Sequence, residues 1–460
     1  MERIVDFFKN PSEYEGKTIA ISGWIRNNRS QAQFGFIDLN DGTSFKTVQV
    51  VYEEALSNFK NIQKMRNGAS VEVTGTFVLT PDRGQPFEIK AQEVKLLGDS
   101  TPDFPIQPKR HTREFLRELP HLRVRTNLFN AVFRVRNTAA FAIHKFFQER
   151  GFLYVHTPLI TSNDGEGAGQ LFSVSTDSKN PYTDFFGKRT YLTVTGQLHV
   201  EPFAMAFRNV YTFGPAFRAE NSNTQKHASE FWMVEPEMAF CDLKGEMDTA
   251  EALVKYVIKD VLENAKDEME FFDKFVEKGL IDRLNAVLNT KEFARVTHKD
   301  AITLLRESKV DFENEPKYGE DIAREHEKWL TEHFNGPVFV YDWPKDIKAF
   351  YMKVNADGET VAASDLLVPE SGELVGGSQR EENLDVLVKR MDELKMNKEI
   401  LDWYLDTRRY GGCVHSGFGL GFERLIMFLT GVDNIIMFLT GVDNIRDVEA
   451  YPRTPNNCEF

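Results

Sequence analysis

The sequence predicts an α+β protein with more than one domain, and three observations support that prediction. Its 460 residues exceed the usual length of a single domain. Its N-terminal part is patterned as short strands separated by turn residues. Further along the chain, strand-like runs and a block of helical periodicity occupy separate segments. Segregation of strands and helices along a chain is typical of the α+β class.

The composition is that of a globular protein and excludes several classes. The formal net charge of −14 argues against non-specific coating of nucleic acid, which rests on many Lys and Arg contacts to phosphates. Cys241, Cys413 and Cys458 lie far apart without a CxxC pair, so neither a disulfide framework nor a cysteine zinc site is expected. Because the sequence has neither a membrane-length apolar run nor a signal or transit pattern, we expect a cytoplasmic protein without membrane contact.

Residues 1–100 predict a small β-barrel. Five segments are rich in β-branched and aromatic residues: KTIAISGWI, FGFIDL, KTVQVVY, SVEVTGTFVL and PFEIKAQEVKLL. Five short strands suit a closed barrel of the oligonucleotide-binding (OB) type. Its strand face would then offer Arg26, Arg29, Phe34, Phe36 and Gln49 to a nucleic acid. The alternative is that these aromatic residues belong to the barrel core.

Beyond the barrel, the chain changes character several times. Residues 101–127 contain several prolines and are then strongly basic, which indicates a hinge with a positive face. An amphipathic helix is expected over residues 128–150. Residues 242–334 are acidic, poor in glycine and helically patterned, so they predict a helical insertion. Strand-like runs return after Pro337, namely VFVYDW, AFYMKV, ETVAASDLLV and GELVGGSQ, and GFGLGFERLIMFL ends them by switching to helical period.

Two segments far apart in the chain carry the residues expected for chemistry. The run GFGLG lacks the third glycine and the βαβ context of a dinucleotide fingerprint, so that interpretation is rejected. Its glycines would let a strand lie flat against a ligand, with Arg424 one turn into the following helix. Upstream, FGPAFRAENSNTQKHASEFWMVEPEMAF predicts a hairpin that presents cations, a carboxylate and an aromatic ring side by side. This combination suits a nucleotide.

Taken together, these segments resemble the class II aminoacyl-tRNA synthetases. GFLYVHTPLIT resembles the first motif of that class, FRAE…HASEF the second and GFGLGFER the third. The N-terminal barrel joined by a basic hinge resembles the subgroup specific for aspartate, asparagine or lysine. The segments EGAGQLF, TGQLHVE, FWMVEPEMAF, KAFYMKV, GELVGGSQRE and RRYGGCVHSGFGLGFER most resemble the bacterial type of asparaginyl-tRNA synthetase.

The resemblance implies an architecture and a set of partners. Residues 1–100 would form an anticodon-binding OB domain, residues 101–127 a hinge, and residues 128–460 a catalytic domain with an antiparallel sheet flanked by helices. It implies ATP and magnesium as cofactors, L-asparagine and tRNA(Asn) as substrates, and a homodimer with Pro158 at its interface. Phe36, Gln49 and Arg26 would contact the anticodon.

The resemblance also implies roles at the nucleotide end of the site. Arg218 would contact the α-phosphate and, with Arg424, would be catalytic. Glu220 would meet the adenine amino group, and His227 and Arg424 the γ-phosphate. Phe231 would stack on the adenine, with Arg424 covering its other face. Glu373 would bind the magnesium ion, which prefers hard oxygen ligands. The reaction itself needs alignment and charge neutralisation more than a base, because the attacking carboxylate is already ionised at neutral pH.

The choice of amino acid depends on four further positions. Glu166 and Gln197 match positions that hold the ammonium and carboxylate ends of the substrate, and Arg380 matches the arginine that meets the side-chain carbonyl oxygen. An arginine alone would favour aspartate. Glu235 is expected to accept a hydrogen bond from the substrate NH₂ and to repel an aspartate carboxylate, which favours asparagine. Glu235 as a surface acid on an alternating strand is the alternative at the residue level. Aspartyl-tRNA synthetase activity and a catalytically impaired, tRNA-binding paralogue are the alternatives for the whole chain.

The C-terminal part contains an exact duplication. The ten residues 426–435, IMFLTGVDNI, are repeated at 436–445. Two copies are too few for a repeat architecture, so the second copy is interpreted as an insertion. Gly431, Asp433 and Asn434 predict that the helix stops after the first copy. Residues 432–445 would then contain an added excursion, with a short helix over 436–440.

Overall fold

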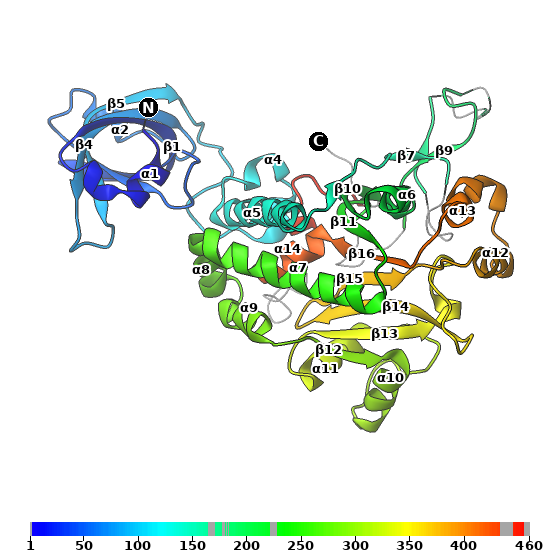
Figure 1. Ribbon diagram of the computed structural model, residues 1–460. Coiled ribbons are helices and arrows are strands. Elements are labelled where there is room, and N and C mark those ends of the chain that lie inside the picture. The colour runs from blue at the N-terminus through cyan, green and yellow to red at the C-terminus, as the bar shows by residue number, and fades with distance from the viewer. Residues whose placement is uncertain are drawn as a thin grey trace. The chain divides into compact units, whose positions relative to one another are not determined.

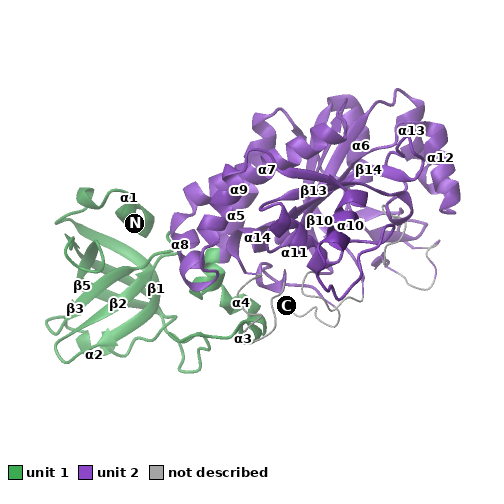
Figure 2. Ribbon diagram, turned by 90° about the horizontal axis from the view of Figure 1, so that it is seen from below, with its two compact units in different colours: residues 1–131 green, residues 132–460 purple. Residues whose placement is uncertain are grey.

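The computed structural model describes residues 2–163, 171–176, 180, 182, 184–220, 228–432 and 445–454. The chain divides into two compact units, residues 1–131 and 132–460 (Figures 1 and 2). Within the described ranges, the helices are all too short or too polar to span a bilayer.

The first unit contains a closed five-stranded barrel with the strand order β1-β2-β3-β5-β4. The strands are β1 Thr18–Ser30, β2 Phe34–Asn40, β3 Val48–Glu53, β4 Ser70–Leu79 and β5 Phe87–Gly98. Side chains alternate between the two faces of a strand, so Ile19, Ile21 and Ile25 point into the barrel core. Phe77 and Phe87 are core residues, whereas Phe36 is only half-buried. The predicted OB-type barrel is therefore confirmed.

Short helices complete the first unit and form part of the predicted hinge. They are α1 Ile4–Lys9, η1 Pro11–Glu13, α2 Phe59–Ile62, α3 Arg113–Arg117 and α4 Pro120–Arg123. The basic run of the hinge is not uniformly exposed. Arg123 is fully buried, and its guanidinium lies 4.3 Å from the ring centroid of Phe129. Arg123 therefore stabilises the start of the next helix and does not contribute to a positive surface.

The second unit is organised around an eight-stranded sheet with the order β12-β13-β14-β15-β16-β11-β10-β6. Its strands are β6 Leu153–Tyr154, β10 Asn209–Phe217, β11 Glu230–Ala239, β12 Ala294–Thr297, β13 Val338–Pro344, β14 Thr360–Val368, β15 Gly372–Gln379 and β16 His415–Gly421. The strands from β13 to β10 are antiparallel, and β12 and β6 join the two edges in parallel. A small sheet contains β7 Ile160–Thr161, β8 Ser173–Val174 and β9 Thr190–Leu192.

Helices flank this sheet, as predicted (Figure 1). They are α5 Asn127–Glu149, α6 Gln197–Phe207, α7 Leu243–Asn264, α8 Lys266–Phe275, α9 Leu280–Asn289, α10 His298–Glu307, α11 Arg324–His333, α12 Leu384–Glu393, α13 Asp402–Arg409 and α14 Phe422–Thr430. The short helices η2 Lys345–Ile347, η3 Lys398–Leu401 and η4 Ile445–Asp447 lie between them in sequence or follow them. Helix α7 packs against β14, β15 and β16, and α6 packs against β10 and β11. These two contacts place α6 and α7 beside the strands that carry the site described below.

Two segments differ from the expected local structure. The predicted helical insertion, residues 242–334, also contributes β12, which pairs with β13 and extends the sheet. The segment AFYMKV was expected to be a strand, but it forms only two isolated bridges, Met352 with Arg380 and Val354 with Val361. The segment does not continue as a strand, because Phe350 and Tyr351 pack into an apolar cluster with α12 and α13.

The end of α14 agrees with the prediction for the first copy of the duplication. The helix ends at Thr430, and Gly431 adopts φ 63°, in the left-handed region that favours glycine at a helix end. The predicted excursion and its short helix over 436–440 lie outside the described residues.

Candidate active site

A cavity of about 760 Å³ opens on the sheet of the second unit, where β15, β16 and β11 are neighbours. Eight of the predicted ATP-binding and amino-acid-binding residues line this one cavity: Gln197, Arg218, Glu220, Phe231, Glu235, Glu373, Arg380 and Arg424. Glu166 and His227, which were also predicted, lie outside the described residues. Residues from positions 197 to 424 therefore converge on a single site.

Strand β11 forms one wall of the cavity. Alternate side chains of a strand share a face, so Phe231, Met233 and Glu235 all line the cavity. Arg218 directly follows β10, which pairs with β11 through Phe217 and Glu230. Its guanidinium lies 5.4 Å from the ring centroid of Phe231. A cation beside an aromatic face is the arrangement predicted for a nucleotide.

Helix α14 brings Arg424 to the same cavity. Arg424 donates from Nη1 to Oε2 of Glu373 at 3.1 Å and to the carbonyl oxygen of Glu373 at 3.2 Å. The preceding residue fastens the helix to its surroundings. Glu423 accepts a hydrogen bond from Nη2 of Arg136 at 2.7 Å and another from the backbone N–H of Trp232 at 2.9 Å. The start of α14, and with it Arg424, is thereby held against β11.

Glu373 has a second carboxylate beside it. A Cβ atom placed on Gly376 would lie 3.4 Å from Oε1 of Glu373 and 3.5 Å from Oδ1 of Asp365, so both carboxylates flank one point of the cavity lining. Asp365 also accepts a hydrogen bond from Nζ of Lys348 at 2.7 Å. Burial and the charge of Glu373 raise the pKa of Asp365 to about 6, although Lys348 opposes this shift. A cation placed between the two carboxylates would relieve their repulsion.

Glu235 lies where the cavity meets the start of α6. It is 6% exposed, and it accepts hydrogen bonds from the backbone N–H of Gly196, at 2.8 Å, and from the hydroxyl of Thr195. That hydroxyl in turn accepts from the backbone N–H of Gln197 at 3.1 Å. A carboxylate at the N-terminus of a helix is favoured by the free N–H groups there. Glu235 is thus a buried, oriented acceptor at the cavity wall and not the surface acid of the alternative interpretation.

Arg380 is held from behind by Glu237. Its Nε and Nη2 donate to the two carboxylate oxygens of Glu237, each at 3.0 Å, and its Nη1 donates to Ser378 Oγ at 2.7 Å. Gly417 on the neighbouring strand leaves room for this pair, because a Cβ there would lie 2.1 Å from Glu237 Oε2. An arginine has five N–H donors, so two of the five remain for a ligand in the cavity.

Sequence reasoning missed Asp365, Lys348 and the partner role of Glu237. Asp365 lies in β14, which is buried throughout, and Glu237 lies in the buried half of β11. An acid at a core position is rarely left unpaired, so this pattern is the signal that could have found them.

The barrel presents a separate candidate surface. Phe36 packs edge-on against Phe34 with centroids 5.5 Å apart, and the guanidinium of Arg29 lies 5.6 Å from the Phe36 ring. Gln49 accepts from Arg29 at 3.5 Å. Arg26, which was predicted to join them, instead donates to Oδ1 of Asn127 at 2.8 Å. The arginine beside Phe36 and Gln49 is therefore Arg29.

Comparisons with known proteins agree with this arrangement. A family model described as tRNA synthetases class II (D, K and N) matches residues 112–455, and one described as an OB-fold nucleic acid binding domain matches residues 19–97. The chain is 61% identical to asparagine--tRNA ligase of Acholeplasma laidlawii, with 98% of each chain covered. It is 55% identical to asparagine--tRNA ligase of Alkaliphilus oremlandii, with 99% of each covered. The chain belongs to the asparagine--tRNA ligase family.

Solved structures of this family share the fold. Asparaginyl-tRNA synthetase from Pyrococcus horikoshii, complexed with asparaginyl-adenylate, matches with a TM-score of 0.86 and 32% identity over 97% of each chain. The corresponding complex from Entamoeba histolytica matches with a TM-score of 0.83 and 28% identity. The predicted class II architecture and the prediction of an aminoacyl-tRNA synthetase are therefore confirmed.

Proposed function

We propose that this chain activates L-asparagine with ATP and then transfers asparagine to tRNA(Asn). The observation that carries the proposal is that Glu235 and Arg380 line the same cavity. The other residues of this cavity suit a nucleotide. Arg380 offers N–H donors to the side-chain carbonyl oxygen of asparagine, and Glu235 offers acceptor oxygens to its NH₂. An aspartate side chain would place a second carboxylate against Glu235, which disfavours the aspartate alternative.

In the first step, a carboxylate oxygen of asparagine attacks the α-phosphorus of ATP, and the bond to the β-phosphate oxygen breaks. The products are asparaginyl-adenylate and pyrophosphate. Arg218 neutralises charge at the α-phosphate, while Phe231 and Arg424 enclose the adenine and Glu220 accepts from its amino group. Glu166 and Gln197 bind the ends of the amino acid, and His227 contacts the γ-phosphate. Such fixed charges lower the barrier without needing a base.

In the second step, a hydroxyl of the terminal ribose of the tRNA attacks the activated carbonyl carbon, and AMP leaves. The barrel would hold the anticodon through Phe36 and Gln49, with Arg29 beside them. Base stacking on an exposed aromatic ring is the usual basis of such binding.

Magnesium fits this site as a partner of the nucleotide. Glu373 and Asp365 supply two hard oxygen donors on one part of the cavity lining, and magnesium bound to nucleotides typically uses one or two carboxylates besides phosphates. When bound, the ion would neutralise charge on the phosphates. Glu373 and Asp365 would hold it, and Lys348 would keep Asp365 ionised in its absence.

We also infer a homodimer that acts in the cytoplasm, where tRNA is charged for translation. Support for the dimer comes from the segment around Pro158, in which Leu153, Tyr154, Leu159 and Ile160 are exposed. Several large apolar side chains exposed close together are typical of an interface. A single monomeric species across the working concentration range, in sedimentation experiments, would contradict the dimer.

The variant Arg218→Ala tests whether the cavity is catalytic. Asparagine-dependent ATP–pyrophosphate exchange should fall by about 10²–10³-fold, as for the loss of other preorganised charge contacts, while tRNA binding should stay unchanged. Arg409→Ala is the matched control, because Arg409 forms surface ion pairs with Asp402 and Asp406 and does not line the cavity. Equal losses of exchange and tRNA binding in Arg218→Ala would favour misfolding of the variant or the impaired, tRNA-binding alternative.

A further inference from the structure

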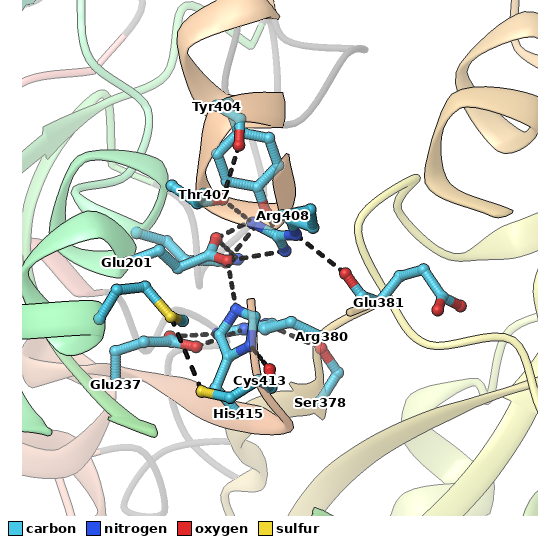
Figure 3. Close-up of polar contacts among 12 residues, drawn as sticks. Glu201, Glu237, Ser378, Arg380, Glu381, Tyr404, Thr407, Arg408, Cys413 and His415 are labelled. Carbon is cyan, nitrogen blue, oxygen red and sulfur yellow. Dashed lines mark hydrogen bonds and ion pairs between the residues drawn. The ribbon is translucent and has the colours of Figure 1, made fainter. Parts of the chain in front are cut away.

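A buried carboxylate lies behind the amino acid end of the cavity and has no role in the steps above. Glu201 is carried by α6, one turn after Gln197, and it is fully buried. Figure 3 shows it surrounded by Tyr404, Arg408 and His415. Its oxygens accept hydrogen bonds from the Tyr404 hydroxyl at 2.7 Å, from Nη2 of Arg408 at 3.0 Å and from His415 Nε2 at 2.9 Å.

Glu201 also contacts a residue of the cavity directly. Nε2 of Gln197 donates to Oε2 of Glu201 at 3.3 Å, and both side chains are buried. Burial alone would raise the pKa of Glu201, but the charge of Arg408 and the hydrogen bond from His415 outweigh burial and hold that pKa below its ordinary range. An ionised carboxylate can only accept hydrogen bonds, so the NH₂ of the Gln197 amide must face it.

This contact decides which atom Gln197 offers to a ligand. The two ends of a glutamine amide are nearly equal in size, so sterics alone would not distinguish them. With Nε2 turned to Glu201, the other end of the amide, the acceptor Oε1, is left for the cavity that Gln197 lines. An acceptor oxygen suits the α-ammonium group and would repel the α-carboxylate, so of the two ends of the amino acid Gln197 would take the ammonium end.

We propose that Glu201 is a positioning residue for the amino acid substrate: it holds the Gln197 amide so that Oε1 meets the α-ammonium group. This inference rests on the proposed function. Arg408 and His415 serve the same end indirectly, because they keep the Glu201 carboxylate ionised. Removal of the Glu201 charge would free the Gln197 amide to rotate without emptying any volume.

The test compares two ligands that differ only at the ammonium group. L-asparagine and succinamate, which is asparagine without its α-amino group, are measured by exchange kinetics and by competitive inhibition of exchange. In Glu201→Gln, asparagine should bind at least about tenfold more weakly, because the buried hydrogen bond from its α-ammonium group to Gln197 Oε1 is lost. Succinamate binding and the KM for ATP should change by less than about twofold, since neither ligand depends on that hydrogen bond.

Tyr404→Phe is the matched control. It removes one hydrogen bond to the same carboxylate but leaves the contact between Glu201 and Gln197, so it should lower the melting temperature without changing the ratio of the two affinities. If Glu201→Gln fails to fold, the double variant Glu201→Gln/Arg408→Met removes both charges of the buried pair, a change that proteins tolerate better, and the same ratio is measured.

An unchanged ratio in a folded Glu201→Gln enzyme would overturn the inference, as would equal weakening of both ligands. Failure of the proposed function would look different. In that case the unaltered chain itself would show no asparagine-dependent exchange.

Discussion

The guanidinium of Arg380 and the carboxylate of Glu237 form a two-point contact, with Nε to Oε1 and Nη2 to Oε2 each at 3.0 Å. Both residues are buried, Glu237 completely. A contact of this planar kind fixes the orientation of the arginine as well as its position. The donors that Arg380 keeps for a ligand are therefore preorganised before the substrate arrives.

Breaking the Arg380–Glu237 ion pair should lower the free energy of unfolding more than breaking an ion pair at the surface. Glu237→Gln leaves a buried arginine without its counter-charge, and we expect a loss of about 3–5 kcal/mol in the free energy of unfolding. It should also raise the KM for asparagine. Urea unfolding measures the first effect and exchange kinetics the second. Glu382→Gln, which weakens a partly exposed pair with Lys353, should cost less than about 1 kcal/mol. Equal stability of the two variants would contradict the importance of the Glu237 contact.

Glu246 predicts a pH dependence of stability. It is fully buried on α7, where burial raises its pKa to about 8 despite the hydrogen bond from Ser364. Between an ordinary carboxyl pKa of about 4.3 and pH 8, the folded chain holds this proton and the unfolded chain does not, so the contribution of Glu246 to stability falls as pH rises through this window. Glu246→Gln should remove that fall.

The measurement is the free energy of unfolding at pH 5, 6.5 and 8 for both proteins. The stability of Glu246→Gln relative to the unaltered chain should increase by roughly a few kcal/mol from the lowest to the highest pH. Glu263→Gln, on the exposed side of the same helix, is the control and should give a profile parallel to that of the unaltered chain. A parallel profile for Glu246→Gln would mean that Glu246 is ionised in the folded protein.

In the barrel, Phe36→Ala should separate tRNA recognition from activation. Loss of a stacking ring weakens binding by about 1–3 kcal/mol, so charging of tRNA(Asn) should need more tRNA while exchange stays unchanged. Phe77→Ala is the comparison, because Phe77 is fully buried in the barrel core and its loss should destabilise the domain. If Phe36→Ala destabilises the barrel as much as Phe77→Ala does, Phe36 is a packing residue.

Deleting residues 436–445 should leave adenylate formation intact. Helix α14 ends within the first copy, before Gly431, and the second copy adds a further apolar run, IMFL, to the sequence. We expect the deletion variant to be at least as soluble and to have a higher melting temperature. A less stable and less active variant would show that the second copy has become part of the fold.

Local pattern predicted the elements well where one face of a strand is buried. The segment SVEVTGTFVL became β4 over its full length, because its alternating residues fill the barrel. Pattern failed at AFYMKV, where Phe350 and Tyr351 pack with helices that come much later in the chain. A β-strand and an extended segment that only packs through its side chains have similar apolar residues. They differ in the neighbouring segments that they contact, which the local sequence does not reveal.

The site was predicted residue by residue for the side chains that match motifs, but not for those that hold them. Glu235 and Arg380 lie in segments that match family motifs. Glu201 and Asp365 were missed because their roles depend on long-range contacts, with Arg408 and Lys348 respectively. The partners in such pairs are separated by many residues in sequence, so a single sequence does not indicate which residues come into contact. The choice between Arg26 and Arg29 for the barrel face shows the same limit. A register shift in β1 between Ile25 and Asn27 changes which residues share a face, and the sequence pattern did not indicate this shift.

Amino-acid-dependent ATP–pyrophosphate exchange, run with asparagine and with aspartate, tests the central claim most directly. Because Glu235 offers an acceptor to an amide and repels a carboxylate, kcat/KM for asparagine should exceed that for aspartate by about 10²-fold or more, and Glu235→Gln should lose most of that difference. Exchange that runs as well with aspartate, or a Glu235→Gln variant that keeps its selectivity, would contradict the account.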